Sequence, residues 1–129
     1  MAKRIKEKTE KIKQAKDTRP YASVRFARVA PTKAKIVIDQ VRGKSYGDAV
    51  AILANMPQDA AAILLKVVKS AGANAENNQG LNVNDLYLAE VVLGSGPVRR
   101  NKVYSRGKGS ANRIDTRHSH IKVVLGVKE

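Results

Sequence analysis

Apolar positions with helical spacing fill the middle of the chain. After Pro31, a residue favoured in the first turn of a helix, apolar side chains recur at i, i+3, i+4 and i+7, and Gly43 follows as a helix C′ glycine does. Ser45 and Asp48 resemble a capping box at the start of a second helix. A third helix is predicted over about residues 58–77. The apolar faces of these three helices comprise Ala34, Val37, Ile38, Val41, Tyr46, Ala49, Val50, Leu53, Ala60, Leu64, Val67, Val68, Ala71 and Ala75.

Strand patterns lie on either side of these helices. Residues 21–29 alternate between apolar and polar positions, and 77–80 is a cluster of turn-forming residues. Two more apolar runs, 86–93 and 121–127, come late in the chain. On the first strand, the residues expected to share one face are Ala22, Val24 and Phe26.

The order strand, three helices, two strands predicts an α+β fold. We expect three helices packed on a small antiparallel β-sheet, with a long protruding β-hairpin at about residues 94–120. Residues 21–129 would form this single globular domain, and residues 1–20 a basic, flexible N-terminal tail. In the tail only Ile5 and Ile12 are strongly apolar, too few to anchor a helix in water.

A strongly cationic segment, 96–122, separates the last two strands. It carries eight Lys and Arg residues against one acid, Asp115, so it has almost nothing to bury and cannot form a core. Arginine outnumbers lysine five to three, which suits phosphate contacts. The segment is therefore expected to be the far part of the hairpin, facing a polyanion. Glycines that would let its backbone approach another molecule, or bend the strand, are Gly94, Gly96, Gly107 and Gly109.

Charge narrows the choice of partner. The 129 residues include 25 Lys and Arg against 11 Asp and Glu, a net charge of +14, and the neutral middle (43–80) lies between cationic ends. Nucleic acid is the first candidate partner, because no basic amphipathic stretch carries the aromatic anchors typical of membrane binding. The absence of cysteine excludes disulfides and thiolate chemistry. With no long apolar run and no signal-peptide pattern, a cytoplasmic protein is expected.

Two motifs are candidates for a nucleotide-binding loop and a metal site, but the residues around each motif do not complete such a site. Gly43-Lys44-Ser45 resembles the end of a phosphate-binding loop, but that motif needs a glycine where Ile38 stands. His118 and His120 share one face of a strand, but no further histidine or cysteine completes a metal site. No metal, cofactor or catalytic residue is predicted. A strand within a nucleic-acid interface is the preferred interpretation of the histidine pair.

Several separated motifs together resemble one family. In order they are Arg28–Lys35 (RVAPTKAK), Val41–Lys44 (VRGK), Ser70–Asn77 (SAGANAEN), Gly96-Pro97, Arg106–Gly109 (RGKG) and Ser119–Ile121 (SHI). Over about residues 22–127 the chain resembles large ribosomal subunit protein 22 of the bacterial type. Members bind large-subunit ribosomal RNA during assembly, and their extended hairpin helps to line the exit tunnel of the nascent peptide.

The resemblance implies partners and site residues. The partners would be large-subunit ribosomal RNA, neighbouring ribosomal proteins and the nascent polypeptide. The protein would be bound to cytoplasmic ribosomes, and no membrane partner is expected. The expected RNA-binding residues, from the resemblance and the charge pattern together, are Arg25, Arg28, Thr32, Lys33, Lys35, Arg42, Lys44, Arg99, Arg100, Lys102, Arg106, Lys108, Arg113, Arg117, His118, Ser119, His120 and Lys122. The expected tunnel-facing tip is Arg100, Asn101, Lys102, Val103, Tyr104, Ser105, Arg106, Gly107, Lys108 and Gly109.

Two other classes of function remain open from the residues alone. One is a free nucleic-acid-binding module, such as an architectural DNA binder with the same basic arm. The other is a basic nuclease with His118 or His120 as general base. The tip, Ser105–Ala111, differs from the usual Pro-Arg-Ala-Arg/Lys-Gly-Arg-Ala of the family. Of the five aromatic residues, Tyr104 near the tip is the candidate to stack on RNA.

Overall fold

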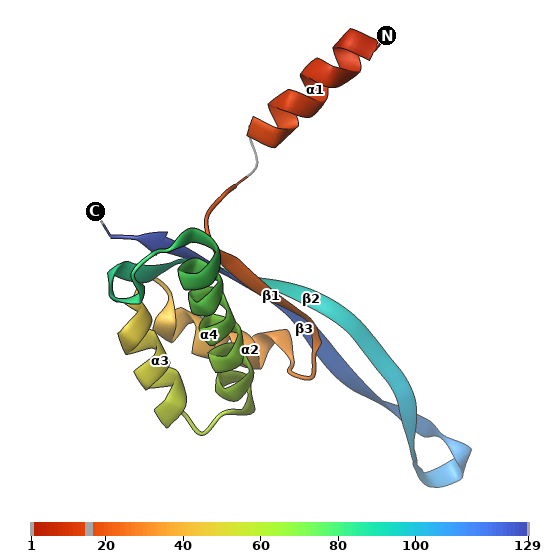
Figure 1. The fold of residues 1–129 in the computed structure, drawn as a ribbon. Coiled ribbons are helices and arrows are strands. Elements are labelled where there is room, and N and C mark those ends of the chain that lie inside the picture. Colours follow the sequence, from red (N-terminus) through yellow and green to blue (C-terminus); the bar gives the residue numbers. More distant parts are fainter. Residues whose placement is uncertain (1, 15–16, 129) are drawn as a thin grey trace.

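A computed structural model of the chain describes residues 2–14 and 17–128. Its three strands form one antiparallel sheet in the order β1-β3-β2, and three helices, α2 to α4, cover one face of the sheet (Figure 1). The predicted α+β fold with a long protruding hairpin is confirmed. The elements are α1 (Ala2–Gln14), β1 (Tyr21–Ala27), α2 (Pro31–Val41), α3 (Tyr46–Asn55), α4 (Asp59–Gln79), η1 (Val83–Asp85), β2 (Leu86–Ser105), η2 (Gly107–Gly109) and β3 (Ala111–Val127).

The boundaries of α2 and α3 follow from local signals. α2 begins at Pro31, and beyond its end Gly43 adopts a left-handed φ of +75°, which glycine reaches without strain. Ser45 caps α3, where its Oγ accepts a hydrogen bond of 3.2 Å from the backbone N–H of Asp48. The N-cap half of the predicted capping box is therefore present, while the Asp48 carboxylate accepts a hydrogen bond from the Ser45 hydroxyl rather than from the Ser45 backbone N–H.

α4 packs closely against α3. A Cβ placed on Gly72 would lie 2.6 Å from the ring of Tyr46, so the ring rests directly on the α4 backbone. Burial, and secondarily the charge of Glu76, raises the pKa of the Tyr46 phenol. The predicted turn over 77–80 is too long. α4 continues to Gln79, and only Gly80, with a φ of +64°, lies at the end of the helix.

The core lies between α2 to α4 and the inner face of the sheet. Full burial of each large aliphatic side chain there contributes roughly 1.5–3 kcal/mol relative to exposure. The predicted inward positions Ala34, Val37, Ile38 and Val41 of α2 are all buried. The sheet residues of the core cluster with at most 4% exposure are Leu86, Leu88, Val91, Ile121, Val123 and Leu125.

The first strand departs from the predicted alternation at its end. Ala22 is buried and Val24 is half-buried, as expected, but Phe26 is 60% exposed. The pairing with β3 shifts register between Val24 and Ala27, so that Ala27 takes the buried place instead. A β-bulge adds one residue to the strand and reverses the face on which the following side chains point. The expectation that Phe26 shares a face with Ala22 and Val24 is therefore wrong.

The hairpin is the outer part of the β2–β3 pair. β1 pairs with β3 only between Ser119 and Val124, whereas β2 pairs with β3 from Leu86↔Val127 to Ser105↔Ala111. Beyond the end of β1 the sheet is therefore a two-stranded ribbon. It leaves the domain at the end opposite the C-terminus (Figure 1).

The N-terminal segment contains a helix that the pattern did not predict. α1 lies apart from the sheet and from α2 to α4 (Figure 1), and its described side chains, including Ile5 and Ile12, are exposed. Lys, Glu and Gln favour helices through their own backbone preferences, which explains a helix without a buried face. Met1, Ala15, Lys16 and Glu129 lie outside the described residues. The division into a flexible tail at 1–20 and a domain at 21–129 stays a prediction.

Deletion of residues 99–112 is predicted to leave the domain folded. These residues contribute no buried side chain among those described, and Val98 pairs with Arg117, so residues 113–116 can close the shortened hairpin. We expect a cooperative thermal transition by circular dichroism, lowered by no more than a few degrees. Leu88→Ala, in contrast, removes a fully buried side chain and should cost about 2–5 kcal/mol. A deletion variant that melts without a cooperative transition would show that the arm supports the core.

Candidate nucleic-acid interface

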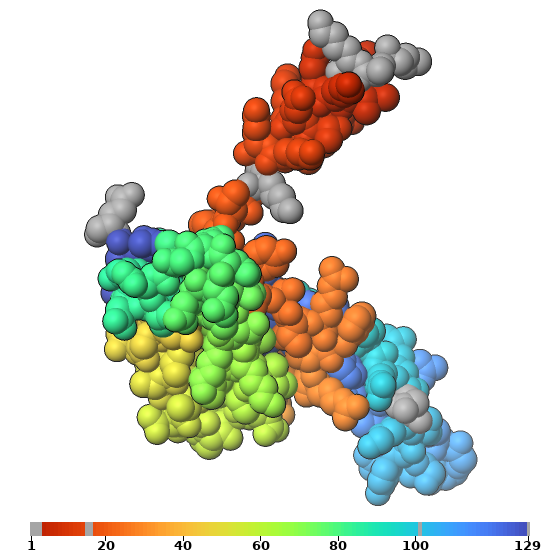
Figure 2. Space-filling view, viewed as in Figure 1, coloured from red at the N-terminus to blue at the C-terminus, as the bar shows by residue number. Residues whose placement is uncertain are grey.

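Residues 99–117, which we call the hairpin arm, expose every described side chain. The ladder pairs Arg99 with Thr116 and Val103 with Arg113, so cationic residues come from both strands. The arm projects clear of the domain (Figure 2), which gives it two faces and two edges open to a partner. The side chain of Asn101 lies outside the described residues. The expected RNA-binding cations on the arm are Arg99, Arg100, Lys102, Arg106, Lys108, Arg113 and Arg117.

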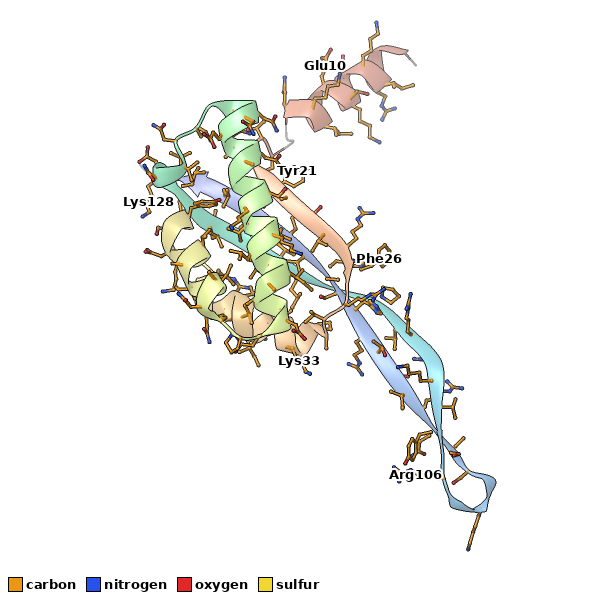
Figure 3. All side chains as sticks on the ribbon, turned by 60° about the horizontal axis from the view of Figure 1, so that its bottom comes forward. Glu10, Tyr21, Phe26, Lys33, Arg106 and Lys128 are labelled. Atoms are coloured by element: carbon orange, nitrogen blue, oxygen red, sulfur yellow. The ribbon has the colours of Figure 1, made fainter. Side chains whose placement is uncertain are left out.

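A groove of about 580 Å³ lies where the arm meets the domain. It is lined by Arg28, Lys33 and Arg117, but also by Asp59 and Asp115. Lys33, in the first turn of α2, lies at the end of the domain from which the hairpin extends (Figure 3), and Thr32 beside it is exposed. Two carboxylates among three cations weaken the attraction for phosphate here, whereas the arm carries seven cations against one acid, Asp115.

Three of the expected cations lie along or beyond α2, away from the arm. Lys35 is exposed on α2. After the helix, the Lys44 carbonyl accepts a 2.9 Å hydrogen bond from Leu88 N–H, in the part of β2 remote from the arm. Arg42 is partly engaged, because it lies 3.4 Å from Asp39 and donates to the carbonyl of Val91 at 3.3 Å. The expected site is thus divided between the arm with its base and the far end of α2.

Some cations of the sheet and arm contact neighbouring side chains. Arg25 is exposed on β1, while the Nζ of Lys122 lies 4.8 Å from the ring centroid of Tyr21. The Arg106 guanidinium lies 5.2 Å from the ring centroid of Tyr104, the predicted stacking residue. Arg100 lies 3.9 Å from Asp115, a long and exposed pair worth little. Apart from Arg42 and Arg100, no expected RNA-binding cation forms an ion pair with any residue in 2–14 or 17–128.

The histidine pair forms part of the protein interior. His118 is 6% exposed and Ser119 is fully buried, so neither side chain is presented to a ligand in this conformation. His118 Nδ1 donates to the Pro97 carbonyl at 3.2 Å. His120 is half-buried, and its Nδ1 accepts a 3.0 Å hydrogen bond from Phe26 N–H. The hydrogen bonds of His118 and His120 thus join β3 to β2 and β1, while the buried Ser119 Oγ has no hydrogen-bond partner in the described part of the chain. RNA binding by these three side chains stays a prediction.

Gly96 gives close approach within the hairpin itself, whereas a Cβ on Gly94 would lie at an ordinary contact distance of 3.5 Å from the His120 Cβ. Gly94 pairs with His120. A Cβ on Gly96 would lie 2.9 Å from the backbone oxygen of His118. The expectation that this glycine admits another molecule is therefore wrong, because the space beside it is taken by β3. At the tip, Gly109 has a φ of +72° and open space where a Cβ would stand, as a turn glycine does.

A charge cluster fixes the chain just before β1. The Arg19 guanidinium donates to Asp17 at 2.7 Å and to Glu90 on β2 at 2.8 Å. Hydrogen bonds from the Arg19 side chain and backbone lower the pKa of Asp17 to about 2. With two carboxylates as partners, Arg19 is already neutralised and contributes little to an anion site.

Phe26 is the exposed residue that the pattern missed. Its ring lies on the surface at the base of the hairpin (Figure 3), edge-on to His120 with ring centroids 4.9 Å apart. No signal in the sequence locates the bulge that turns it outward, because Ala22, Val24 and Phe26 alternate regularly.

Neither a metal cluster nor a membrane-spanning helix occurs in the described part of the chain. Within 2–14 and 17–128, no three His, Asp or Glu side chains gather to hold a metal ion. None of the described helices is long and apolar enough to cross a membrane.

Gly96→Ala is predicted to disturb the base of the hairpin. The added Cβ meets backbone atoms, which can move apart only by opening the β2–β3 ladder, so we expect a loss of about 1–3 kcal/mol. Gly107→Ala is the matched control, because its Cβ would meet nothing within 4 Å and should change stability by less than about 0.5 kcal/mol. Thermal melting measures both. Equal melting temperatures for the two variants would contradict the close approach at Gly96.

Comparison with known proteins places the chain in a family. The family described as ribosomal protein L22p/L17e matches residues 22–126. Large ribosomal subunit protein uL22 of Lachnospira eligens is 47% identical over 110 residues, 85% of each chain. The uL22 protein of Acetivibrio thermocellus is 46% identical over 104 residues, 81% of this chain and 82% of its own. This chain belongs to the ribosomal protein L22p/L17e family.

Proposed function

We propose that the protein is a structural constituent of the large ribosomal subunit and binds large-subunit ribosomal RNA during assembly. The observation that carries the proposal is the hairpin arm, a narrow two-stranded ribbon whose described side chains are all exposed and mostly polar or cationic. The relatives named above are large ribosomal subunit proteins, which supports this choice among polyanions.

Attraction to RNA would come mainly from phosphate neutralisation. Lys and Arg side chains that contact phosphates release condensed counterions, so affinity falls as salt rises. Specificity would come from shape, because the ribbon can enter between RNA segments while the domain stays at their surface. The neutral, helix-covered part of the domain would set the angle of the arm.

The tip is the part proposed to reach the exit tunnel. η2 and the adjoining ends of β2 and β3 lie farthest from the domain (Figure 1). We propose that residues 100–109 face the nascent polypeptide, and that other surfaces of the domain meet neighbouring ribosomal proteins. The protein would then be cytoplasmic and ribosome-bound.

The nuclease alternative is disfavoured by the surroundings of the histidines. A general base must reach the proton that it abstracts, but His118 is buried against Pro97 and the Nδ1 of His120 is occupied by Phe26 N–H. The role we propose is therefore non-enzymatic. An architectural DNA binder shares the basic arm, so it has to be separated by experiment.

Binding to a large-subunit rRNA transcript is predicted to be tighter than to duplex DNA at equal salt, and to weaken steeply as salt rises. Replacing Arg99 and Arg117 by Gln should lower the slope of log K against log salt by about one for each lost phosphate contact. The control is Lys66→Gln with Lys69→Gln, which removes the same charge from exposed positions on α4. Filter binding across a salt series measures all three proteins.

Two results would contradict the proposal. Equal affinity for rRNA and duplex DNA would favour the architectural DNA binder. An equal loss of slope in the α4 control would mean that net charge, and not the arm, attracts the RNA.

A further inference from the structure

Phe26 exposes an aromatic ring on a cationic surface. The side chain is 60% exposed, at the point where β1 ends and the arm begins (Figure 3). Leaving a large apolar ring in water forfeits the free energy of its burial. A single exposed aromatic residue needs no explanation by itself, so its significance depends on how the ring is held and on what surrounds it.

The backbone at Phe26 is held in an unfavourable conformation. Its φ is +58°, in the left-handed region that bulky residues rarely adopt. The pairing of β1 with β3 shifts register at this position, and such bulges often re-aim a side chain beside a functional site. Strain of this kind persists only where the surrounding structure maintains it, and it tends to occur where ligands bind.

His120 maintains this arrangement from β3. Its Nδ1 accepts the Phe26 N–H at 3.0 Å, and its ring meets the Phe26 ring edge-on, with an interplanar angle of 83° and centroids 4.9 Å apart. One imidazole therefore fixes both the backbone and the ring of Phe26. This arrangement holds the ring in place before any partner arrives, which reduces the entropy lost on binding.

The ring also lines a hollow of about 300 Å³. The other lining residues are Arg28, Pro97, Arg99 and His118. Both arginines are exposed, and each presents a planar cation that suits phosphate or a nucleobase face. The hollow thus combines an aromatic surface with two cations, while none of its lining residues is acidic.

We propose that this hollow binds one unpaired nucleobase of the RNA. The base stacks on Phe26, and Arg28 and Arg99 bind the phosphates on either side of the nucleotide. Stacking on aromatic side chains and arginine planes is the usual way in which proteins hold unstacked RNA bases. The inference rests on the proposed function. It adds the class of ligand, an RNA nucleotide that is not base-paired, and the place on the protein surface where this nucleotide binds.

An acidic or apolar protein segment is the competing occupant, and the ligand chemistry separates the two. A nucleobase has a π-face that gains more from an aromatic ring than from an aliphatic side chain of similar hydrophobicity, whereas an acidic or aliphatic segment gains nothing from stacking. Phe26→Leu therefore keeps an apolar contact while it removes stacking, whereas Phe26→Tyr keeps both.

The test is the affinity of full-length variants for a large-subunit rRNA transcript. We expect Phe26→Ala and Phe26→Leu to bind about 5- to 150-fold more weakly, the range for loss of one base–aromatic stack, and Phe26→Tyr to bind as the parent does. Phe26→Gly should bind as weakly as Phe26→Ala. Its melting temperature should be no lower than that of Phe26→Ala, because glycine adopts the positive φ without strain. The control Val127→Ala changes a 47% exposed side chain at the opposite end of β3 and should have no effect.

A fluorescence measurement reports stacking directly. The chain contains no tryptophan, so Phe26→Trp introduces a single indole, whose emission rRNA should quench by stacking. Val127→Trp should show little quenching.

Three results would overturn the base site. They are parental affinity for Phe26→Ala, parental affinity for Phe26→Leu, and equal quenching of the two tryptophans. If one of these results is found while the parent chain binds rRNA and Arg99→Gln weakens that binding, the proposed function still stands. Failure of the parent chain to bind rRNA would instead reject the proposed function, and the base site with it.

Discussion

The pairing of β2 with β3 is the constraint on which the rest of the structure depends. The two strands span 20 and 17 residues and belong to two environments at once. Where β2 begins and β3 ends, side chains such as Leu88 and Leu125 are buried in the core. In the arm, every described side chain is exposed. An isolated two-stranded hairpin is marginally stable in water. The arm therefore keeps its direction because the same strands are fixed in the domain by β1 and by α2 to α4.

The junction between domain and arm shows how tightly this is arranged. Gly96 lets the backbone of β3 approach β2, His118 and Ser119 fill the space that remains, and His120 joins β3 to the bulge at Phe26. These polar residues look like ligand-binding groups when read along the sequence. In the fold they are structural, and we propose that the arginines around them bind the RNA. Charge and rigidity thus come from different residues, so the arm keeps its direction while it carries like charges.

Much of the fold could be predicted because local signals agreed with the tertiary structure. Pro31, Gly43 and Ser45 set helix boundaries, and the apolar spacing of α2 matches its buried face. The failures have physical causes that a single sequence does not reveal. A bulge reverses the face of Phe26 without changing the alternation, and α1 forms by backbone propensity with no apolar stripe. The cationic arm was predictable from charge. That Arg42 and Lys44 lie away from the arm was not predictable, because it depends on where α2 ends in space.

The central claim is that the arm, and not the helical face, enters the RNA. Site-directed hydroxyl-radical cleavage tests it most directly, because the chain has no cysteine and one introduced thiol carries the iron chelate. Lys108→Cys places the probe at the tip, and Lys69→Cys places it on the exposed side of α4. In large subunits assembled with each variant, we predict strong rRNA cleavage from position 108, in segments distant from one another in sequence, and weak cleavage from position 69. Equal cleavage from both positions, or none from position 108, would contradict the account.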